Sequence, residues 1–361
     1  MATRPVRGPS GELSADEIAE LGGSLHETLQ TACPVQEPVV EGLIDRGQIV
    51  VIAARPGTGK TPLLTQLVSA VSVGKPFLDF ATRQCRGAII DLESSPARHR
   101  EQMQRQWRTM SIGDEAARNI DAFVRGNADD PNSRELDRVL TKCSHVQRWI
   151  WLKKVATRRG YGLIVVDTAL AFTPFKAADE EKTRSLFSWA SGLRQAPSHP
   201  AIVLVLHLRK PDRKTPTPKL LEDPYSWTDE FLGSGVWSAS ADVRLGLENI
   251  GKDDHVAFAG FRRGNGEVSP RIIEPQVEEL DGHDHPTIWK LVEPSLAVGS
   301  VINGTQLARF NKLPVGQEVT WSDFLNVTGA PKVSASRLIQ RATAAGVLDY
   351  DPSRKTYRRR V

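Results

Sequence analysis

Short runs of almost wholly apolar residues alternate along the chain with stretches of helical periodicity. The runs lie at residues 49–53, 88–91, 163–167 and 202–207. Strands that are apolar throughout are typical of a parallel sheet buried on both faces. Two alternating segments, 242–249 and 255–262, predict an antiparallel hairpin, and residues 287–292 predict one more strand. We therefore expect an α/β fold with a mainly parallel sheet.

The two ends of the chain differ from this central pattern. Ser14 with Glu17 three residues later forms a capping box, which predicts a helix that extends to about Gln30. Residues 209–235 are rich in Pro, Lys and Asp and predict a long loop. We expect an N-terminal arm at 1–38, an α/β domain at 39–293, a linker at 294–303 and a small basic domain at 304–361.

Composition excludes several classes of protein. Hydrophobic residues make up 40% of the 361 residues and charged residues 25%, which argues against collagen-like and wholly disordered chains. The apolar runs are far shorter than the ~18–20 residues of a membrane span, and the first residues lack the apolar stretch of a secretory signal. Cys33, Cys85 and Cys143 are too widely spaced for a metal knuckle or a disulfide framework. We expect a cytoplasmic protein without a membrane partner.

A glycine-rich turn joins the first apolar strand to a helical run. Its sequence is Ala54-Arg55-Pro56-Gly57-Thr58-Gly59-Lys60-Thr61-Pro62. Strand, turn and helix in this order are the context that a P-loop requires, with backbone amides arranged around an anion at a helix N-terminus. Gly57 and Gly59 allow the backbone to approach closely, Lys60 is expected to reach the β- and γ-phosphates, and the Thr61 hydroxyl to bind Mg²⁺. Pro62 is tolerated in the first helical turn, and Ala54 replaces the first Gly of the motif. The turn predicts a site for ATP and Mg²⁺ at residues Arg55 to Pro62.

Two other apolar strands end in carboxylates, and a third ends in a histidine. Asp167 ends the strand 163–167 in the Walker B pattern and is expected to orient Mg²⁺ through water. Residue 168 is Thr, so the general base must come from elsewhere; Glu93 is our candidate and Asp91 is the competing carboxylate. His207 ends another strand, where it would contact the γ-phosphate and report its loss to the next loop. A solvated acid and a structural histidine are the alternatives for Glu93 and His207.

These motifs together resemble the RecA-fold hexameric helicases of the DnaB and plasmid RepA types. The stretch 47–61 is similar to the DnaB-type P-loop, which also carries Ala-Arg-Pro and lacks the first Gly. The strand end Asp91-Leu92-Glu93, His207 and the segment 233–242 are similar to the RepA branch. The resemblance covers about residues 40–273. It implies a RecA-like core, an ATPase activity with ATP and Mg²⁺, and assembly as a homo-oligomer, a hexameric ring.

The resemblance also implies residues that act between subunits and on DNA. A neighbour would donate an arginine to the γ-phosphate, and the matching positions are Arg262 and Arg263, which remain equivalent candidates. Two loops would line a channel for single-stranded DNA, at 171–182 and 208–231. Their candidate residues are Phe172, Phe175 and Lys176 in the first loop, and Arg209, Lys210, Arg213, Lys214 and Lys219 in the second. A solvated basic turn is the alternative for Arg262 and Arg263, and a disordered charged insert is the alternative for the second loop.

The C-terminal region carries an excess of positive charge. Residues 301–361 contain ten Lys or Arg and four Asp or Glu, although the whole chain has a net charge of only +4. A short helix from about Thr320, a second helix at 332–345 and a basic ribbon are the winged-helix pattern. Arg337 and Arg341 would lie on the groove-facing helix, and Arg354 and Lys355 in the wing. We expect duplex DNA binding, with protein docking as the alternative.

The leading hypothesis is a ring-forming ATPase that translocates on or unwinds DNA in replication of a plasmid, phage or other mobile element. The alternative is an ATP-switched DNA-binding regulator or helicase loader without unwinding activity. A metabolic P-loop kinase fits less well, because no acceptor pocket is evident and a basic C-terminal module is unnecessary for it.

Overall fold

A computed structural model gives the fold of the chain. It describes residues 37–208, 218–229, 235–250, 255–264, 266–280, 283–292, 310–329, 335, 338–339, 342–343, 347–351 and 354–360. Its contacts divide the chain into two units, 1–37 and 38–361. The predicted helix after Ser14 and the predicted linker at 294–303 lie outside the described residues.

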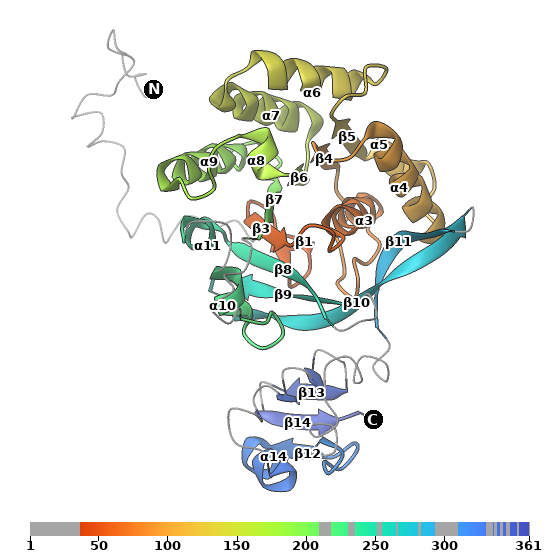
Figure 1. The fold of residues 1–361 in the computed structure, drawn as a ribbon, viewed down its shortest axis with the longest axis vertical. Helices are drawn as coiled ribbons and strands as arrows, with labels where there is room; N and C mark the ends of the chain where they lie inside the picture. The colour runs from red at the N-terminus through yellow and green to blue at the C-terminus, as the bar shows by residue number, and fades with distance from the viewer. Residues whose placement is uncertain are drawn as a thin grey trace, which may run out of the picture. The chain divides into compact units, whose positions relative to one another are not determined.

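A nine-stranded sheet forms the centre of the α/β region (Figure 1), in the order β11-β10-β9-β8-β3-β7-β6-β4-β5. The strands are β3 (Ile49–Ala54), β4 (Gly87–Asp91), β5 (Ile120–Val124), β6 (Leu163–Asp167), β7 (Ala201–His207), β8 (Val243–Asn249), β9 (Val256–Arg262), β10 (Gly266–Leu280) and β11 (His283–Leu291). Strands β8, β3, β7, β6, β4 and β5 run parallel, and β8 to β11 form an antiparallel meander. The predicted α/β fold with a mainly parallel sheet is confirmed, as are the hairpin and the last strand.

Both faces of the sheet are buried. Ile49 and Val51 of β3 enter one core with α7 (His145–Arg159), α8 (Ala169–Phe172) and α9 (Glu180–Leu193). Val50 and Ile52 enter the opposite core with α3 (Lys60–Val73). Successive residues of a strand point to opposite faces, so a strand buried on both sides must be apolar throughout. The burial of both faces therefore accounts for the apolar runs that predict these strands.

The remaining elements of the α/β region surround this sheet. They are β1 (Pro38–Val40), β2 (Ile44–Asp45), α4 (Pro96–Thr109), α5 (Glu115–Arg118), α6 (Pro131–Lys142), α10 (Pro224–Asp229) and α11 (Val236–Ser240). The long α7 begins at a capping box formed by Ser144 and Gln147, and Ser95 caps α4 through the N–H of Arg98. None of the helices in the described part of the chain combines the length and apolar composition needed to cross a bilayer.

The prediction of a continuous loop at 209–235 is wrong in part, because it contains α10. The Trp227 side chain is buried and lies over Gly246, where any Cβ would overlap its ring. Asp229 is the last residue of the helix, and its carboxylate forms an ion pair of 2.8 Å with the buried Arg244. Packing against β8 and β9 therefore orders a segment whose composition predicted a loop.

The C-terminal residues contain a three-stranded sheet and a helix. The strands β12 (Glu318–Thr320), β13 (Leu348–Asp351) and β14 (Thr356–Arg359) have the order β12-β14-β13, and α14 (Trp321–Thr328) follows β12. Thr320 and Asp323 form the capping box of α14. Residues 335, 338–339 and 342–343 are helical, within the second predicted helix. The order of elements agrees with the predicted one, and the winged-helix assignment stays a prediction.

Candidate active site

The carboxyl ends of four neighbouring parallel strands bring the predicted site residues together. In the register of the sheet Ala54 lies opposite His207, and Asp91 lies opposite Asp167. Helix α3 begins at Lys60, directly after the turn that follows β3. Ligands of open parallel sheets bind at this edge, outside the carboxyl ends of the strands.

The turn from Pro56 to Pro62 forms one wall of a cleft of about 890 Å³. Gly57 and Gly59 have φ angles of 81° and 87°, which are strained for residues with a Cβ. The Thr58 hydroxyl donates to the Arg55 carbonyl at 2.9 Å, which closes the turn. The opposite walls contain Glu93 and His207 together with residues from α4 and from β9 to β11.

The Lys60 ammonium lies against acceptors of its own turn. It donates to the carbonyls of Ala54 and Arg55 at 3.3 and 3.2 Å, and lies 3.3 Å from Nδ1 of His207. Burial lowers the pKa of Lys60, while the nearby Asp167 and Glu93 carboxylates oppose this. A phosphate in the cleft would offer this buried cation a stronger, charge-assisted partner.

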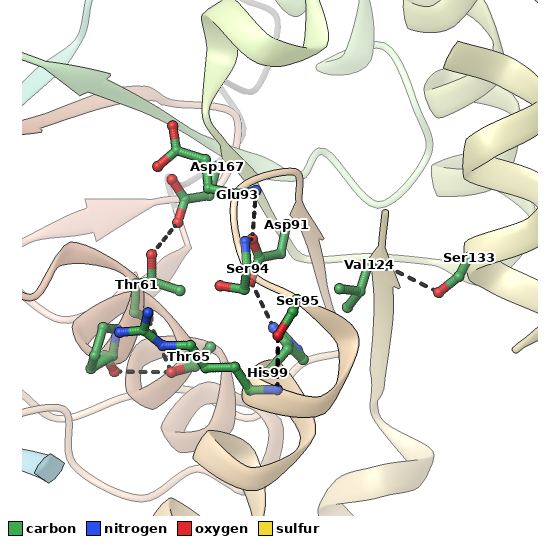
Figure 2. A network of polar contacts seen from close by, with 12 residues as sticks. Thr61, Thr65, Asp91, Glu93, Ser94, Ser95, His99, Val124, Ser133 and Asp167 are labelled. Carbon is green, nitrogen blue, oxygen red and sulfur yellow. Dashed lines mark hydrogen bonds and ion pairs between the residues drawn. The ribbon is translucent and has the colours of Figure 1, made fainter. Parts of the chain in front are cut away.

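Thr61 and Asp167 form a pair suited to a divalent cation. The Thr61 hydroxyl donates to Oδ2 of Asp167 at 2.7 Å (Figure 2). Asp167 is fully buried, and its Oδ1 has no hydrogen-bond partner within the described part of the chain. Burial raises the pKa of Asp167 to about 6, and the neighbouring Asp91 and Glu93 carboxylates add to this, against the Thr61 hydrogen bond. Oxygen atoms are the ligands that Mg²⁺ takes beside substrate phosphates, and here a hydroxyl and a buried carboxylate with one oxygen unpaired among the described residues lie together.

Asp91 and Glu93 have different environments, which separates the two candidate bases. Asp91 is fully buried, and its Oδ1 accepts the N–H groups of Glu93 and Ser94 at 3.1 and 2.9 Å. Its Oδ2 lies 2.8 Å from Nδ1 of His99. Burial alone would raise the pKa of Asp91. The hydrogen bonds from His99 and Ser94 outweigh burial, so the pKa lies below its ordinary value. Asp91 thus holds the turn that carries Glu93, and only Glu93 lines the cleft.

His207 connects the predicted base to the P-loop lysine. Its Nε2 lies 3.0 Å from Oε1 of Glu93, and its Nδ1 faces Lys60. The next residue, Leu208, donates its N–H to the Ala54 carbonyl at 3.2 Å. His207 is therefore placed between the phosphate-binding turn and the segment that follows β7.

The two finger candidates lie away from the cleft of their own chain. Arg262 ends β9 and forms an ion pair of 2.6 Å with Asp45, in which both side chains are mostly buried. Arg263 is exposed, and its guanidinium donates to the Ala239 carbonyl. The two arginines are thus structurally different, which the sequence alone does not reveal.

The predicted DNA-contacting residues of the α/β region are only partly described. Lys176 is exposed between α8 and α9, and Lys219 is exposed and lies 3.7 Å from Glu222. The expectation that Phe172 and Phe175 line a channel is wrong for Phe172, because α8 packs it fully into the core. Phe175 is half-buried and stacks on Trp237. Arg209, Lys210, Arg213 and Lys214 lie outside the described residues.

Acidic residues of the C-terminal sheet offset its arginines. Arg354 and Arg358 both pair with Glu318, at 3.4 and 2.8 Å, and Arg360 pairs with Asp349 at 2.6 Å. Lys355 is exposed in the β13–β14 turn. Arg337 and Arg341 lie outside the described residues. The described face of the sheet therefore alternates in charge and is less basic than the count of charges predicts.

Trp289 of β11 is the main cleft residue that the sequence did not reveal. Its indole lies directly over Gly59 and lines the cleft with Pro275 and Val277. Gly59 and Trp289 are 230 positions apart. No local pattern marks the residue, because the meander that carries it is brought to the P-loop by tertiary packing.

Comparison with known proteins identifies one family. A family model described as "AAA domain" matches residues 15–213, more than half of the chain. A search among curated protein sequences finds no significant match. Among solved structures, the RadB recombinase aligns with a TM-score of 0.44 and 13% identity, over 69% of this chain and 92% of that one.

Proposed function

The chain belongs to the AAA domain family, and on this premise we propose that it is a Mg²⁺-dependent ATPase that assembles as a ring and moves on DNA. The pair formed by Thr61 and Asp167 carries the proposal. A buried carboxylate oxygen that finds no partner among the described residues, next to a hydroxyl and a P-loop lysine, fits a cation bound to a triphosphate.

The residues around the cleft suggest how hydrolysis proceeds. The amides of the turn and Lys60 would bind the phosphates. Thr61 and Asp167 would hold Mg²⁺, which would supply positive charge beside the phosphate oxygens. Glu93 orients a water molecule and accepts its proton as the water oxygen bonds to the γ-phosphorus. The bond to the bridging oxygen breaks, and ADP and phosphate leave. His207 positions Glu93 through their 3.0 Å contact.

We assign the arginine finger to Arg263. Arg262 is engaged by Asp45 of its own chain, whereas Arg263 is exposed and its guanidinium donates to a backbone carbonyl. An exposed guanidinium at a turn is free to reach the γ-phosphate of a neighbouring subunit, where it would stabilise charge in the transition state. A ring of identical subunits, a hexamer in our proposal, would complete each site in this way.

Movement on DNA rests on the link between His207 and the segment after β7. The Leu208 N–H donates to the carbonyl of Ala54, the last residue of β3. A change in the position of His207 on loss of the γ-phosphate would therefore be transmitted to the segment 209–217. We propose that basic residues there and Lys176 contact the backbone of single-stranded DNA in replication of a mobile element. The same link would also serve an ATP-switched regulator or loader that does not unwind DNA.

Hydrolysis and strand displacement provide the test. We expect Mg²⁺-dependent ATP hydrolysis that single-stranded DNA stimulates, displacement of an annealed strand, and loss of nucleotide binding in Lys60→Ala. Stimulation by duplex DNA without displacement would favour the regulator or loader. No binding of ATP at millimolar concentration would refute the ATPase proposal in both forms.

A further inference from the structure

The indole of Trp289 covers the P-loop at Gly59. A Cβ built on Gly59 would lie 2.3 Å from Cζ2 of Trp289, so the ring occupies the space above the glycine. The indole N–H donates to the Gly59 carbonyl at 3.3 Å. Gly59 precedes Lys60 and Thr61, so Trp289 contacts the turn directly before the two residues expected to bind phosphate and Mg²⁺.

Trp289 is itself held by the helix that begins at the P-loop. The side-chain amide of Gln66 on α3 donates to the Trp289 carbonyl at 2.9 Å and accepts the Trp289 N–H at 2.6 Å. Gln66 and Trp289 are both buried, with exposed fractions of 4% and 6%. These bonds occupy the free edge of β11, the outermost strand of the sheet. A second amide, Gln102 of α4, donates to the Thr287 carbonyl at 3.0 Å.

These contacts form a closed path from α3 through Gln66 to Trp289, and from its indole to Gly59 at the start of the same helix. A backbone turn with φ of 87° has many alternatives when it is not constrained. A large rigid ring on one side and a hydrogen bond to its carbonyl restrict those alternatives. Restricting a binding loop to its bound geometry improves affinity by lowering the entropy lost on binding.

We propose that Trp289 is a positioning residue for phosphate binding, which holds Gly59 so that the amides of residues 59–61 stay directed into the cleft. This inference rests on the proposed nucleotide site. It assigns to the β10–β11 pair a role in affinity for the triphosphate and none in the bond-breaking step. Trp289 touches the turn and takes no part in the contacts between Glu93 and His207 and between Thr61 and Asp167.

The test compares two substitutions that remove different parts of the indole. Trp289→Phe keeps a ring and removes the N–H, and Trp289→Leu removes both. We expect the Kd of the full-length protein for MgATP to rise about fivefold in the first, the effect of one hydrogen bond, and more than about tenfold in the second. The kcat at saturating ATP should stay within about twofold, because the catalytic groups are unchanged.

Trp151→Phe is the matched control. Trp151 is a half-buried tryptophan of α7 whose indole N–H donates to Glu135 at 2.7 Å. Its substitution should leave the Kd for MgATP unchanged. The indole emission of the wild type should change when MgATP is added; Trp151→Phe should keep this change and Trp289→Phe should lose it.

Two results would overturn the inference, and they differ from failure of the ATPase proposal. If the wild type binds MgATP and both Trp289 variants bind it equally well, the residue does not position the turn. If both variants lower kcat and melting temperature but leave the Kd unchanged, its role is structural only. If the wild type binds no nucleotide at all, the proposed function fails first.

Discussion

The Thr61 hydroxyl donates to one carboxylate oxygen of Asp167 at 2.7 Å, and the other oxygen of Asp167 is buried without a partner in the described part of the chain. A free carboxylate oxygen at this depth is costly unless a cation or proton satisfies it. The relationship predicts both metal dependence and pH dependence.

Asp167→Asn should weaken the response to Mg²⁺. The amide keeps the size of the side chain but loses the negative charge that orients the cation. We expect the Mg²⁺ concentration for half-maximal ATP hydrolysis to rise, or the activity to fall, by about 10–100-fold, the range found for groups that orient a metal through another ligand. A magnesium titration of ATPase activity measures this. Unchanged magnesium dependence would remove Asp167 from the metal site.

The raised pKa of Asp167 should make the nucleotide-free protein less stable as pH rises from about 4 to 6. The folded state keeps the proton up to about pH 6, whereas the unfolded state loses it near the ordinary pKa of 3.8, so the folded state binds more protons in this window. Melting temperatures of wild type and Asp167→Asn across pH 4 to 7 isolate this contribution, because other acids titrate in both proteins. If the pKa of Asp167 is not raised, the difference in melting temperature between the two proteins should not change with pH over this range.

Glu93→Gln and Asp91→Asn should separate a catalytic from a positioning carboxylate. Glu93 faces the cleft, so Glu93→Gln should bind MgATP with wild-type affinity, retain the wild-type melting temperature and lose turnover. Asp91 is buried in hydrogen bonds to its own turn and to His99. Asp91→Asn should lower the free energy of unfolding by about 1–3 kcal/mol, the cost of a buried polar mismatch. Urea unfolding and single-turnover hydrolysis measure the two effects.

An Asp91 variant with normal stability and no turnover would reverse this assignment. Normal hydrolysis by Glu93→Gln would equally remove Glu93 from the role of base.

Arg262 and Arg263 should respond differently to removal. Arg263→Ala should leave the folded subunit intact and lower hydrolysis by the assembled ring by about 10³-fold or more, the range for fingers in comparable systems. Arg262→Ala should instead lower the melting temperature, because the mostly buried Asp45 would lose its cationic partner and retain the Gln48 amide, a neutral donor.

Mixed assemblies show whether the finger acts between subunits. A Lys60→Ala subunit lacks its own site but offers an intact arginine, and an Arg263→Ala subunit offers the converse. Mixing two inactive proteins should therefore restore part of the activity. Activity that never exceeds the sum of the two separate proteins would contradict a shared site.

The sequence predicted the residues at the carboxyl edge of the sheet and missed those that tertiary packing brings there. Asp91, Asp167 and His207 end apolar strands, and strands that run parallel place their ends at one edge, so their proximity followed from pattern alone. The contact of Trp289 with Gly59 joins distant segments and depends on how the meander packs over α3. The separate environments of Arg262 and Arg263 likewise depend on Asp45 and Ala239, which no local rule relates to them.

Strand β5 escaped prediction for a different physical reason. Its second residue is Asp121, which interrupts the apolar run. In the folded protein this carboxylate accepts hydrogen bonds from Arg86, Arg159 and the Tyr161 hydroxyl. A polar residue is compatible with a buried strand when its partners come from other elements.

Glu318→Gln tests whether the C-terminal sheet contacts DNA. Glu318 pairs with both Arg354 and Arg358, so the substitution removes the negative charge that these two guanidinium groups share without changing the size of the side chain; Arg354 also lies 3.9 Å from Asp351. If this surface binds phosphates, the affinity for duplex DNA should rise by about threefold or more, with a steeper dependence on salt. Fluorescence anisotropy with a labelled duplex at several salt concentrations measures both quantities.

Lys312→Gln is the matched control, since it removes a positive charge from the same region and should weaken any binding that is merely due to net charge. An unchanged affinity for duplex DNA in Glu318→Gln would instead support protein docking by the C-terminal sheet. A surface that does not bind phosphates gains no affinity for DNA when a negative charge is removed.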